Sequence, residues 1–165
     1  MIPKQCIDLV RSFEGYHTRL EDGRYPGISC VNWALYEGAA TYGATLHLMS
    51  PEVDAGPIVD VATFPVAAGD TVATLLAKTY DAMLALALRY APEIAAGTLR
   101  AGNVQWTGAH RSRADLDRLA MIHPAMDGAE IARRVRATTC PPWYPRIEFG
   151  GQVFELIQER CNGGS

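Results

Sequence analysis

The run from Val72 to Ala96 constrains this chain most, because its apolar residues recur with the spacing of an amphipathic helix. Asp70 or Thr71 can cap the start of this helix, and Gly97 ends it. Its apolar residues are expected on one helical stripe: Val72, Leu75, Leu76, Tyr80, Met83, Leu84 and Ala87. Two strand-like runs, 45–49 and 58–66, precede it. The sequence therefore predicts an α/β fold with the long helix packed on a sheet.

The remainder of the chain alternates short helices and strands between glycines and prolines. Residues 32–37 suit a short helix that ends at Gly38, and a second short helix is expected near 113–117. Asp127 can cap a helix over 128–136. Two further strands, 146–149 and 152–156, are joined at Gly150 and Gly151, which predicts a β-hairpin.

Composition and charge exclude several classes of protein. With 165 residues, 48% of them apolar and 20% charged, the chain has the size and core of one globular domain. A net charge of −3 gives no basic surface, which argues against a nucleic acid bound through its phosphates. The four cysteines lie far apart without zinc-site spacing, so we expect a reduced, cytoplasmic protein with no metal. Neither a signal peptide nor a membrane span is expected.

One histidine and one aspartate are candidates for acid–base chemistry. His17 lies in a glycine-containing loop beside Glu14 and Glu21, whose carboxylates favour a charged imidazole that can donate a proton or stabilise an oxyanion. Asp54 opens a Gly-Pro turn next to an apolar run. Each residue also has an ordinary interpretation, since His17 suits an exposed loop and Asp54 suits a turn in which it binds neighbouring amides.

Other polar and aromatic residues have simpler interpretations. His47, inside the strand predicted at 45–49, is expected to be a hydrogen-bonded structural residue. Trp33 is expected in the core or in the wall of a pocket. The sequence contains no nucleophile-elbow serine, no phosphate-binding glycine loop and no zinc-binding His-Glu-x-x-His helix. Nucleotide triphosphate and zinc chemistry therefore have no motif in this chain.

Several motifs in register resemble the catalytic region of folate-dependent formyltransferases. Gly15-Tyr16-His17 is similar to that family's Asn-x-His, residues 31–35 to its short Trp-Ala helix, and residues 43–47 to its Gly-x-Thr-x-His strand. Asp54-Ala55-Gly56 resembles its Asp-x-Gly turn, at nearly the family's distance from His17. Residues 105–145 are similar to the region that follows the catalytic core in sugar N-formyltransferases. The resemblance covers about residues 2–158.

The resemblance implies a fold and a division into regions. The fold would be a three-layer, Rossmann-like half domain with a mixed sheet and flanking helices, followed by a small α/β extension. Residues 1–100 would form the catalytic half domain without the N-terminal Rossmann half. Residues 101–158 would form the extension with a linker, helices and the β-hairpin, and residues 159–165 a disordered tail.

The resemblance also implies a reaction, which is transfer of a formyl group from 10-formyltetrahydrofolate to a primary amine. The acceptor would be a small molecule, a nucleotide-linked amino sugar. His17 would stabilise the tetrahedral oxyanion or shuttle a proton, and Asp54 would orient that imidazole and receive the amine proton. The loop ahead of Asp54 would hold the pterin through Met49, Ser50, Pro51, Glu52 and Val53.

Two departures from the family pattern leave alternatives open. The family's Asn falls at Gly15 or Glu14, and neither side chain can donate a hydrogen bond to an oxyanion. The chain also opens inside the family domain, so a strand near 13–17 would expose an edge that a second copy or a subunit with the missing half must cover. The alternatives are a non-catalytic or truncated binding or oligomerisation module and a protein like methionyl-tRNA formyltransferase.

Overall fold

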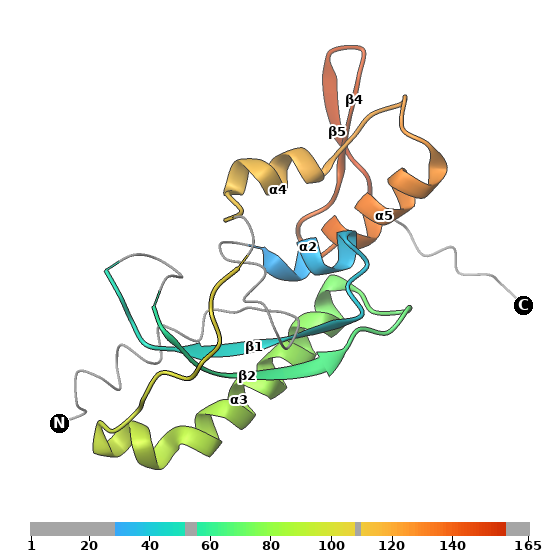
Figure 1. Cartoon of the computed structure of the whole chain (residues 1–165). Helices are drawn as coiled ribbons and strands as arrows, with labels where there is room; N and C mark the ends of the chain where they lie inside the picture. The colour runs from blue at the N-terminus through green and yellow to red at the C-terminus, as the bar shows by residue number, and fades with distance from the viewer. Residues whose placement is uncertain (1–28, 52–55, 108–109, 158–165) are drawn as a thin grey trace, which may run out of the picture.

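A computed structural model describes residues 29–51, 56–107 and 110–157, and Figure 1 shows their arrangement. Helices and strands are interspersed along these residues, as in a mixed α/β fold. Their order is α2 (Cys30–Tyr36), β1 (Thr41–His47), β2 (Ile58–Pro65), α3 (Val72–Ala96), α4 (Arg113–Leu119), β3 (Met121–Ile122), α5 (Gly128–Thr138), β4 (Arg146–Phe149) and β5 (Gln152–Glu155). The predicted α/β class with flanking helices is confirmed.

Strands β1 and β2 form an antiparallel pair that α3 covers on one face (Figure 1). Ala44 and Leu46 of β1 pack against Leu86 of α3. The strand predicted at 45–49 was wrong at both ends, because β1 begins at Thr41 and ends at His47. Gly43, which suggested a boundary, instead pairs with Thr63 inside the ladder.

Helix α3 has the predicted bounds, and its two ends are capped as expected. The Thr71 side chain accepts a hydrogen bond from the backbone of Thr74, and Gly97 ends the helix with a left-handed φ of 65°. The residues predicted on one stripe do not share one environment. Val72 and Leu75 are buried, whereas Tyr80 and Leu84 are 61% and 59% exposed, and the buried Leu86 was not among the predicted residues.

The C-terminal elements build a second sheet of order β3-β4-β5, in which β3 runs parallel to β4 and β5 antiparallel to it. The predicted hairpin is confirmed, with Gly150 and Gly151 both at positive φ in its turn. Leu119 of α4 and Ala137 of α5 join the buried cluster that α2 and the start of α3 also form. The region predicted as an extension therefore shares a core with the residues before it.

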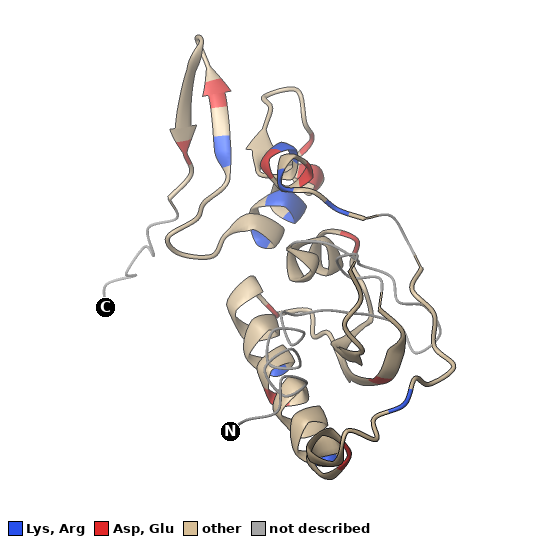
Figure 2. Cartoon of the chain, turned by 90° about the vertical axis from the view of Figure 1, so that its left-hand side faces the viewer, with Lys and Arg blue, Asp and Glu red and all other residues tan. Residues whose placement is uncertain are grey.

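Several of the residues coloured as charged in Figure 2 lie on these C-terminal elements. Glu130 accepts hydrogen bonds from Arg133, from Arg134 at 2.6 Å and from the Tyr36 hydroxyl at 2.9 Å. The Arg133 guanidinium, followed by that of Arg134, lowers the pKa of Glu130 to about 2. Arg134 also donates to the Met121 carbonyl at 3.1 Å, which ties α5 to the residues after α4.

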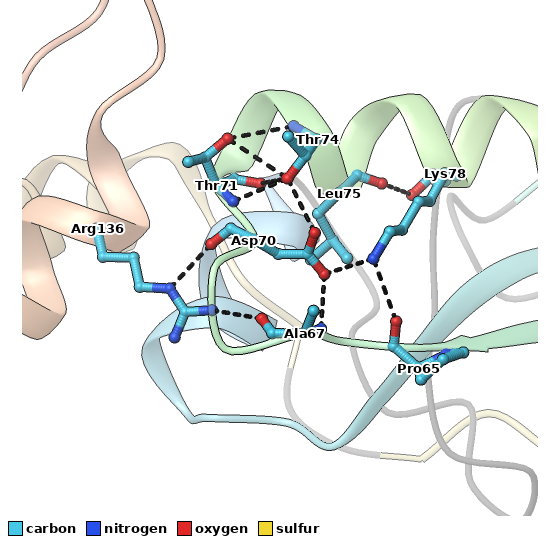
Figure 3. Close-up of polar contacts among 9 residues, drawn as sticks. Pro65, Ala67, Asp70, Thr71, Thr74, Leu75, Lys78 and Arg136 are labelled. Atoms are coloured by element: carbon cyan, nitrogen blue, oxygen red, sulfur yellow. Dashed lines mark hydrogen bonds and ion pairs between the residues drawn. The ribbon is translucent and has the colours of Figure 1, made fainter.

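The turn between β2 and α3 is built around the buried carboxylate of Asp70 (Figure 3). This carboxylate accepts hydrogen bonds from the Ala67 amide at 2.7 Å, the Thr74 hydroxyl at 3.0 Å and the Lys78 amine at 2.6 Å. Arg136 of α5 donates to the carbonyls of Asp70 and Ala67 at 2.9 and 3.2 Å. The turn therefore joins the β1–β2 layer to the C-terminal elements.

Candidate functional site

The loop between β1 and β2 is closed at its base. The Leu48 amide donates to the Pro57 carbonyl at 2.9 Å, so the antiparallel ladder extends one pair beyond His47. A β-bulge between Leu46 and His47 precedes this closure. Both ends of the loop are thus held in place, and the predicted Asp54 lies within the segment that they span.

His47 and Trp106 pack against each other at this base. His47 is 8% exposed, and its Nδ1 lies 3.0 Å from the Leu48 carbonyl oxygen. A carbonyl oxygen can only accept, so this contact needs a proton on Nδ1. The rings of His47 and Trp106 meet edge to face with centroids 5.3 Å apart. The prediction that His47 is a hydrogen-bonded structural residue agrees with these contacts.

Trp106 connects the loop base to a segment far along the chain. Its Nε1 donates to the Gly56 carbonyl at 2.6 Å. The segment that carries Trp106 is held against β2 at Gly102. The Gly102 amide donates a hydrogen bond to the Ile58 carbonyl at 2.7 Å. A Cβ on Gly102 would lie 2.7 Å from the Val59 carbonyl oxygen, so only glycine allows this close approach.

Gly56 is the most crowded position of the loop base. A Cβ at Gly56 would stand 1.6 Å from the Leu48 carbonyl oxygen and 3.1 Å from the His47 Nδ1. The opposing atoms are backbone, which cannot move aside as a flexible side chain would. The sequence Asp54-Ala55-Gly56 therefore has a steric reason for its glycine, independent of any resemblance.

The face of β1 opposite α3 carries a buried polar side chain. Thr45 alternates with Ala44 and Leu46, which pack against α3, so its side chain points to the other face. Thr45 is 5% exposed, and its hydroxyl has no hydrogen-bond partner among the residues that the structure describes. A buried hydroxyl without a partner is costly and suits a place where a bound group meets it.

The structure describes only some of the predicted site residues. Met49, Ser50 and Pro51 follow directly on the closed base, and Met49 is 52% exposed. Glu52, Val53 and Asp54 lie outside the described residues, as does His17. The convergence of His17 and Asp54 therefore stays a prediction.

Sequence reasoning missed the residues that hold the loop in place. The role of Trp106 was not predicted, because a contact across fifty positions leaves no local pattern. The one available signal was the tryptophan itself, in a loop that otherwise suits small polar residues. Trp33, predicted in the core or a pocket wall, is buried, and the Arg111 guanidinium lies 4.2 Å from its ring centroid.

A cavity of about 380 Å³ lies elsewhere, between α2, the start of α3 and the C-terminal elements. Arg113, Arg146 and Trp143 are among its lining residues, and of the predicted site residues that the structure describes, Met49, Ser50 and Pro51, none lines it. Asp117 contacts both arginines, at 3.7 and 3.2 Å, so these two guanidinium groups are paired.

Comparison with a known family shows to which family the chain belongs. The model of the family described as Formyl transferase matches residues 1–89. The chain belongs to the formyl transferase family. Its match includes both predicted catalytic positions and the whole β1–β2 loop with Gly56.

Solved structures of formyltransferases share the fold. A 4-N formyltransferase from Francisella tularensis is 19% identical, with a TM-score of 0.73 over 87% of this chain and 60% of that one. A sugar N-formyltransferase from a Shewanella species is 14% identical, with a TM-score of 0.73 over 87% of this chain and 58% of that one. This chain thus spans less than two thirds of the length of these relatives.

A third solved structure contains ligands. It is an N-formyltransferase from Helicobacter canadensis in complex with folinic acid and dTDP-3-aminofucose. It is 23% identical, with a TM-score of 0.59 over 70% of this chain and 43% of that one. In the part of the chain that our structure describes, no helix is long and apolar enough to cross a membrane.

Proposed function

We propose that this chain carries the catalytic part of an N-formyltransferase that moves a formyl group from 10-formyltetrahydrofolate to a primary amine. The observation that carries the proposal is the closed base of the β1–β2 loop. Gly56, Trp106 and the Leu48–Pro57 pair hold both ends of the segment that contains Asp54. Fixed ends let a loop present a carboxylate to a substrate in one orientation.

The residues next to this base suit a folate. Beyond the Leu48–Pro57 pair the backbone of residues 49–51 leaves the ladder, and Met49 presents an exposed apolar side chain beside it. A pterin is a flat ring with donor and acceptor edges, which such a loop can contact through its backbone and through Met49. The unpartnered hydroxyl of Thr45 adds a buried polar group on the face opposite α3.

In the proposed reaction the acceptor nitrogen attacks the formyl carbon of the donor. His17 donates a hydrogen bond to the oxygen that becomes negative, and Asp54 holds the imidazole and takes the proton that the amine loses. The bond between the formyl carbon and N10 then breaks, N10 takes up the proton that Asp54 received from the amine, and tetrahydrofolate leaves with Asp54 ionised again. Met49–Val53 hold the pterin during these steps.

The acceptor that we propose is a nucleotide-linked amino sugar. The dTDP-3-aminofucose in the complex of the related Helicobacter canadensis N-formyltransferase and the sugar N-formyltransferase from Shewanella support this class. The net charge of −3 gives no support to a tRNA acceptor. Residues 1–100 are proposed as the catalytic half domain, with residues 101–158 as an extension and 159–165 as a tail. We further propose that the protein acts in the cytoplasm.

The direct test is a formyl-transfer assay with 10-formyltetrahydrofolate and dTDP-linked amino sugars. His17→Ala and Asp54→Asn should each lower kcat by at least about a hundredfold, as loss of an oxyanion donor does. His123→Ala and Asp81→Asn are matched controls, because both residues are exposed and lie away from the loop. Both controls should retain activity.

Calorimetry with 5-formyltetrahydrofolate separates the proposal from its alternative. Folate binding with no turnover for any amine would identify a binding module and overturn the enzymatic part of the proposal. Absence of both binding and turnover would overturn the proposal as a whole. Turnover that His17→Ala leaves unchanged would exclude the role given to His17.

A further inference from the structure

The cavity between α2, the start of α3 and the C-terminal elements has the size and the lining of a small-molecule site. Its volume of about 380 Å³ falls within the range of about 300–1,000 Å³ that ligand pockets occupy. Four apolar side chains, all buried or half-buried, belong to its lining: Val31, Val72, Leu76 and Leu116. They come from α2, the start of α3 and α4, which pack around one core (Figure 1). The cavity therefore has an apolar wall on rigid elements.

Trp143 adds an aromatic ring to this lining. Its backbone is fixed, because the Cys140 amide donates to the Trp143 carbonyl at 2.9 Å and the Trp143 amide donates to the Cys140 carbonyl at 2.7 Å. The side chain is 63% exposed, and no hydrogen bond or ring contact of its indole is found within the described ranges. An exposed indole on a fixed backbone, at the edge of a cavity, suits stacking with a flat ligand.

The Arg113 guanidinium, at the start of α4, is available to an anion. It lies 3.7 Å from the Asp117 carboxylate, which is beyond hydrogen-bond distance, and its side chain is 66% exposed. Among the residues that we describe, the Arg113 guanidinium donates no hydrogen bond. A guanidinium presents its N–H donors as a fork that matches the two oxygens of a carboxylate.

The other charges of the lining decide which kind of anion suits the cavity. The Arg146 guanidinium donates to the Asp117 carboxylate at 3.2 Å, and Glu155 is the cross-strand neighbour of Arg146 on β5. Asp117 and Glu155 balance Arg113 and Arg146, so the four ionised side chains carry no net charge. A ligand with one negative charge can pair with Arg113, whereas a second negative charge is repelled by the two carboxylates.

We infer that this cavity binds a flat aromatic monocarboxylate, whose ring stacks on Trp143 beside the apolar wall and whose carboxylate pairs with Arg113. Met49, Ser50 and Pro51 do not line the cavity, so this site is separate from the loop residues that we propose for folate. The inference concerns a second ligand, and it can fail without affecting the proposed formyl transfer.

Calorimetry with 2-naphthoate on the intact chain tests the charge that the ligand needs. The amide 2-naphthamide has the same ring without a charge and should bind at least about tenfold more weakly, because it cannot form a charge-assisted pair with Arg113. The dianion 2-naphthyl phosphate should also bind at least about tenfold more weakly. Binding of the amide as tight as that of 2-naphthoate would overturn the role of the carboxylate. Tighter binding of the phosphate would overturn the assignment to a monoanion.

Variants of the lining test the position of the ligand. Arg113→Ala should weaken binding of 2-naphthoate at least about tenfold, and Arg118→Ala, at an exposed arginine of the same helix outside the lining, should not. Trp143→Leu should weaken it at least about threefold, with Phe149→Leu, at an exposed ring outside the lining, as the matched control. Circular dichroism verifies that the variants are folded. No binding to the wild-type chain, or binding that Arg113→Ala and Trp143→Leu leave unchanged, would overturn the inference.

The Cys140 thiol gives an independent measure of where the ligand binds. Cys140 lines the cavity and is half-buried, whereas Cys30, which also lines it, is buried. With Cys6 and Cys161 changed to serine, 2-naphthoate at about ten times its Kd should slow the reaction of Cys140 with a thiol reagent about tenfold, because about a tenth of the protein is then free. An unchanged rate would overturn the placement in this cavity. Arg113→Ala should leave binding of 5-formyltetrahydrofolate unchanged, and a loss of that binding would overturn the separation of the two sites.

Discussion

The two turns that flank β2 are held by different kinds of interaction. The β1–β2 loop base depends on the absence of a side chain at Gly56, a backbone pair and one neutral hydrogen bond from Trp106. The β2–α3 turn depends on the charged groups of Asp70, Lys78 and Arg136. The first is fixed by shape, which salt and pH affect little, while the second is fixed by charges that both affect.

This difference matches what each turn has to do. In the reaction that we propose, the β1–β2 loop presents Asp54, and fixed ends without charges suit that role because charges near a reacting centre alter its chemistry. The Asp70 turn only joins layers, so a buried carboxylate with three donors can serve there. The Lys78 amine beside it lowers the pKa of the Asp70 carboxyl, although burial opposes that shift.

The largest expected effect is that of Gly56→Ala in the β1–β2 loop base, and Gly69→Ala is the matched substitution in the Asp70 turn. Gly56→Ala places a Cβ against the Leu48 carbonyl oxygen, so we expect a loss of at least about 3 kcal/mol in the free energy of unfolding and no formyl transfer. Gly69→Ala in the Asp70 turn meets nothing within 4 Å and should change stability by less than about 0.5 kcal/mol. Urea unfolding measures both. Equal effects would contradict the contrast between the turns.

A smaller effect is expected from Trp106→Phe. The variant keeps an aromatic ring beside His47 but removes the donor to the Gly56 carbonyl, which costs about 1–3 kcal/mol in the free energy of unfolding. The neutral bond makes this cost the same at low and at high salt. A cost that disappears in high salt would show that charges hold the loop base after all. Trp143→Phe, at an exposed tryptophan, is the control.

A further, smaller loss of stability is expected from Asp70→Asn, which loses the charge paired with Lys78 and should cost about 1 kcal/mol in the free energy of unfolding near pH 7. The pKa of Asp70 is lowered from 3.8 in the folded protein, so its contribution is present above about pH 4 and is lost as pH falls through the folded pKa. Unfolding of wild type and variant from pH 7 to 3 should therefore converge. A constant difference across that range would contradict the charged turn.

The sequence predicts the bounds of a helix or strand well where nearby residues set them, and poorly where contacts with distant segments do. The bounds of α3 follow from Thr71 and Gly97, and the β4–β5 turn from Gly150 and Gly151. The start of β1 was misplaced because Gly43 looks like a boundary, while pairing with β2 keeps it in the strand. The exposure of Leu84 was also missed, since periodicity alone cannot tell which of two apolar faces meets the sheet.

The candidate site also contains residues that a local motif suggests and contacts that only folding creates. His17, Asp54 and Gly56 were identifiable from motifs, because the order of reactive residues is written in the sequence. The steric demand at Gly56 and the bond from Trp106 depend on segments brought together only by folding. A sequence motif can therefore suggest candidate reactive residues, such as His17 and Asp54, whose roles stay predictions, but it does not reveal contacts such as that of Trp106 with Gly56.

A crystal structure of the protein with 5-formyltetrahydrofolate tests the central claim most directly. We predict that the imidazole of His17 and the carboxylate of Asp54 both lie within hydrogen-bond reach of the reacting centre, with the pterin against Met49–Val53. The Leu48–Pro57 pair and the bond from Trp106 to Gly56 should remain intact. His17 and Asp54 on opposite sides of the molecule, or a folate bound away from the β1–β2 loop, would contradict the claim.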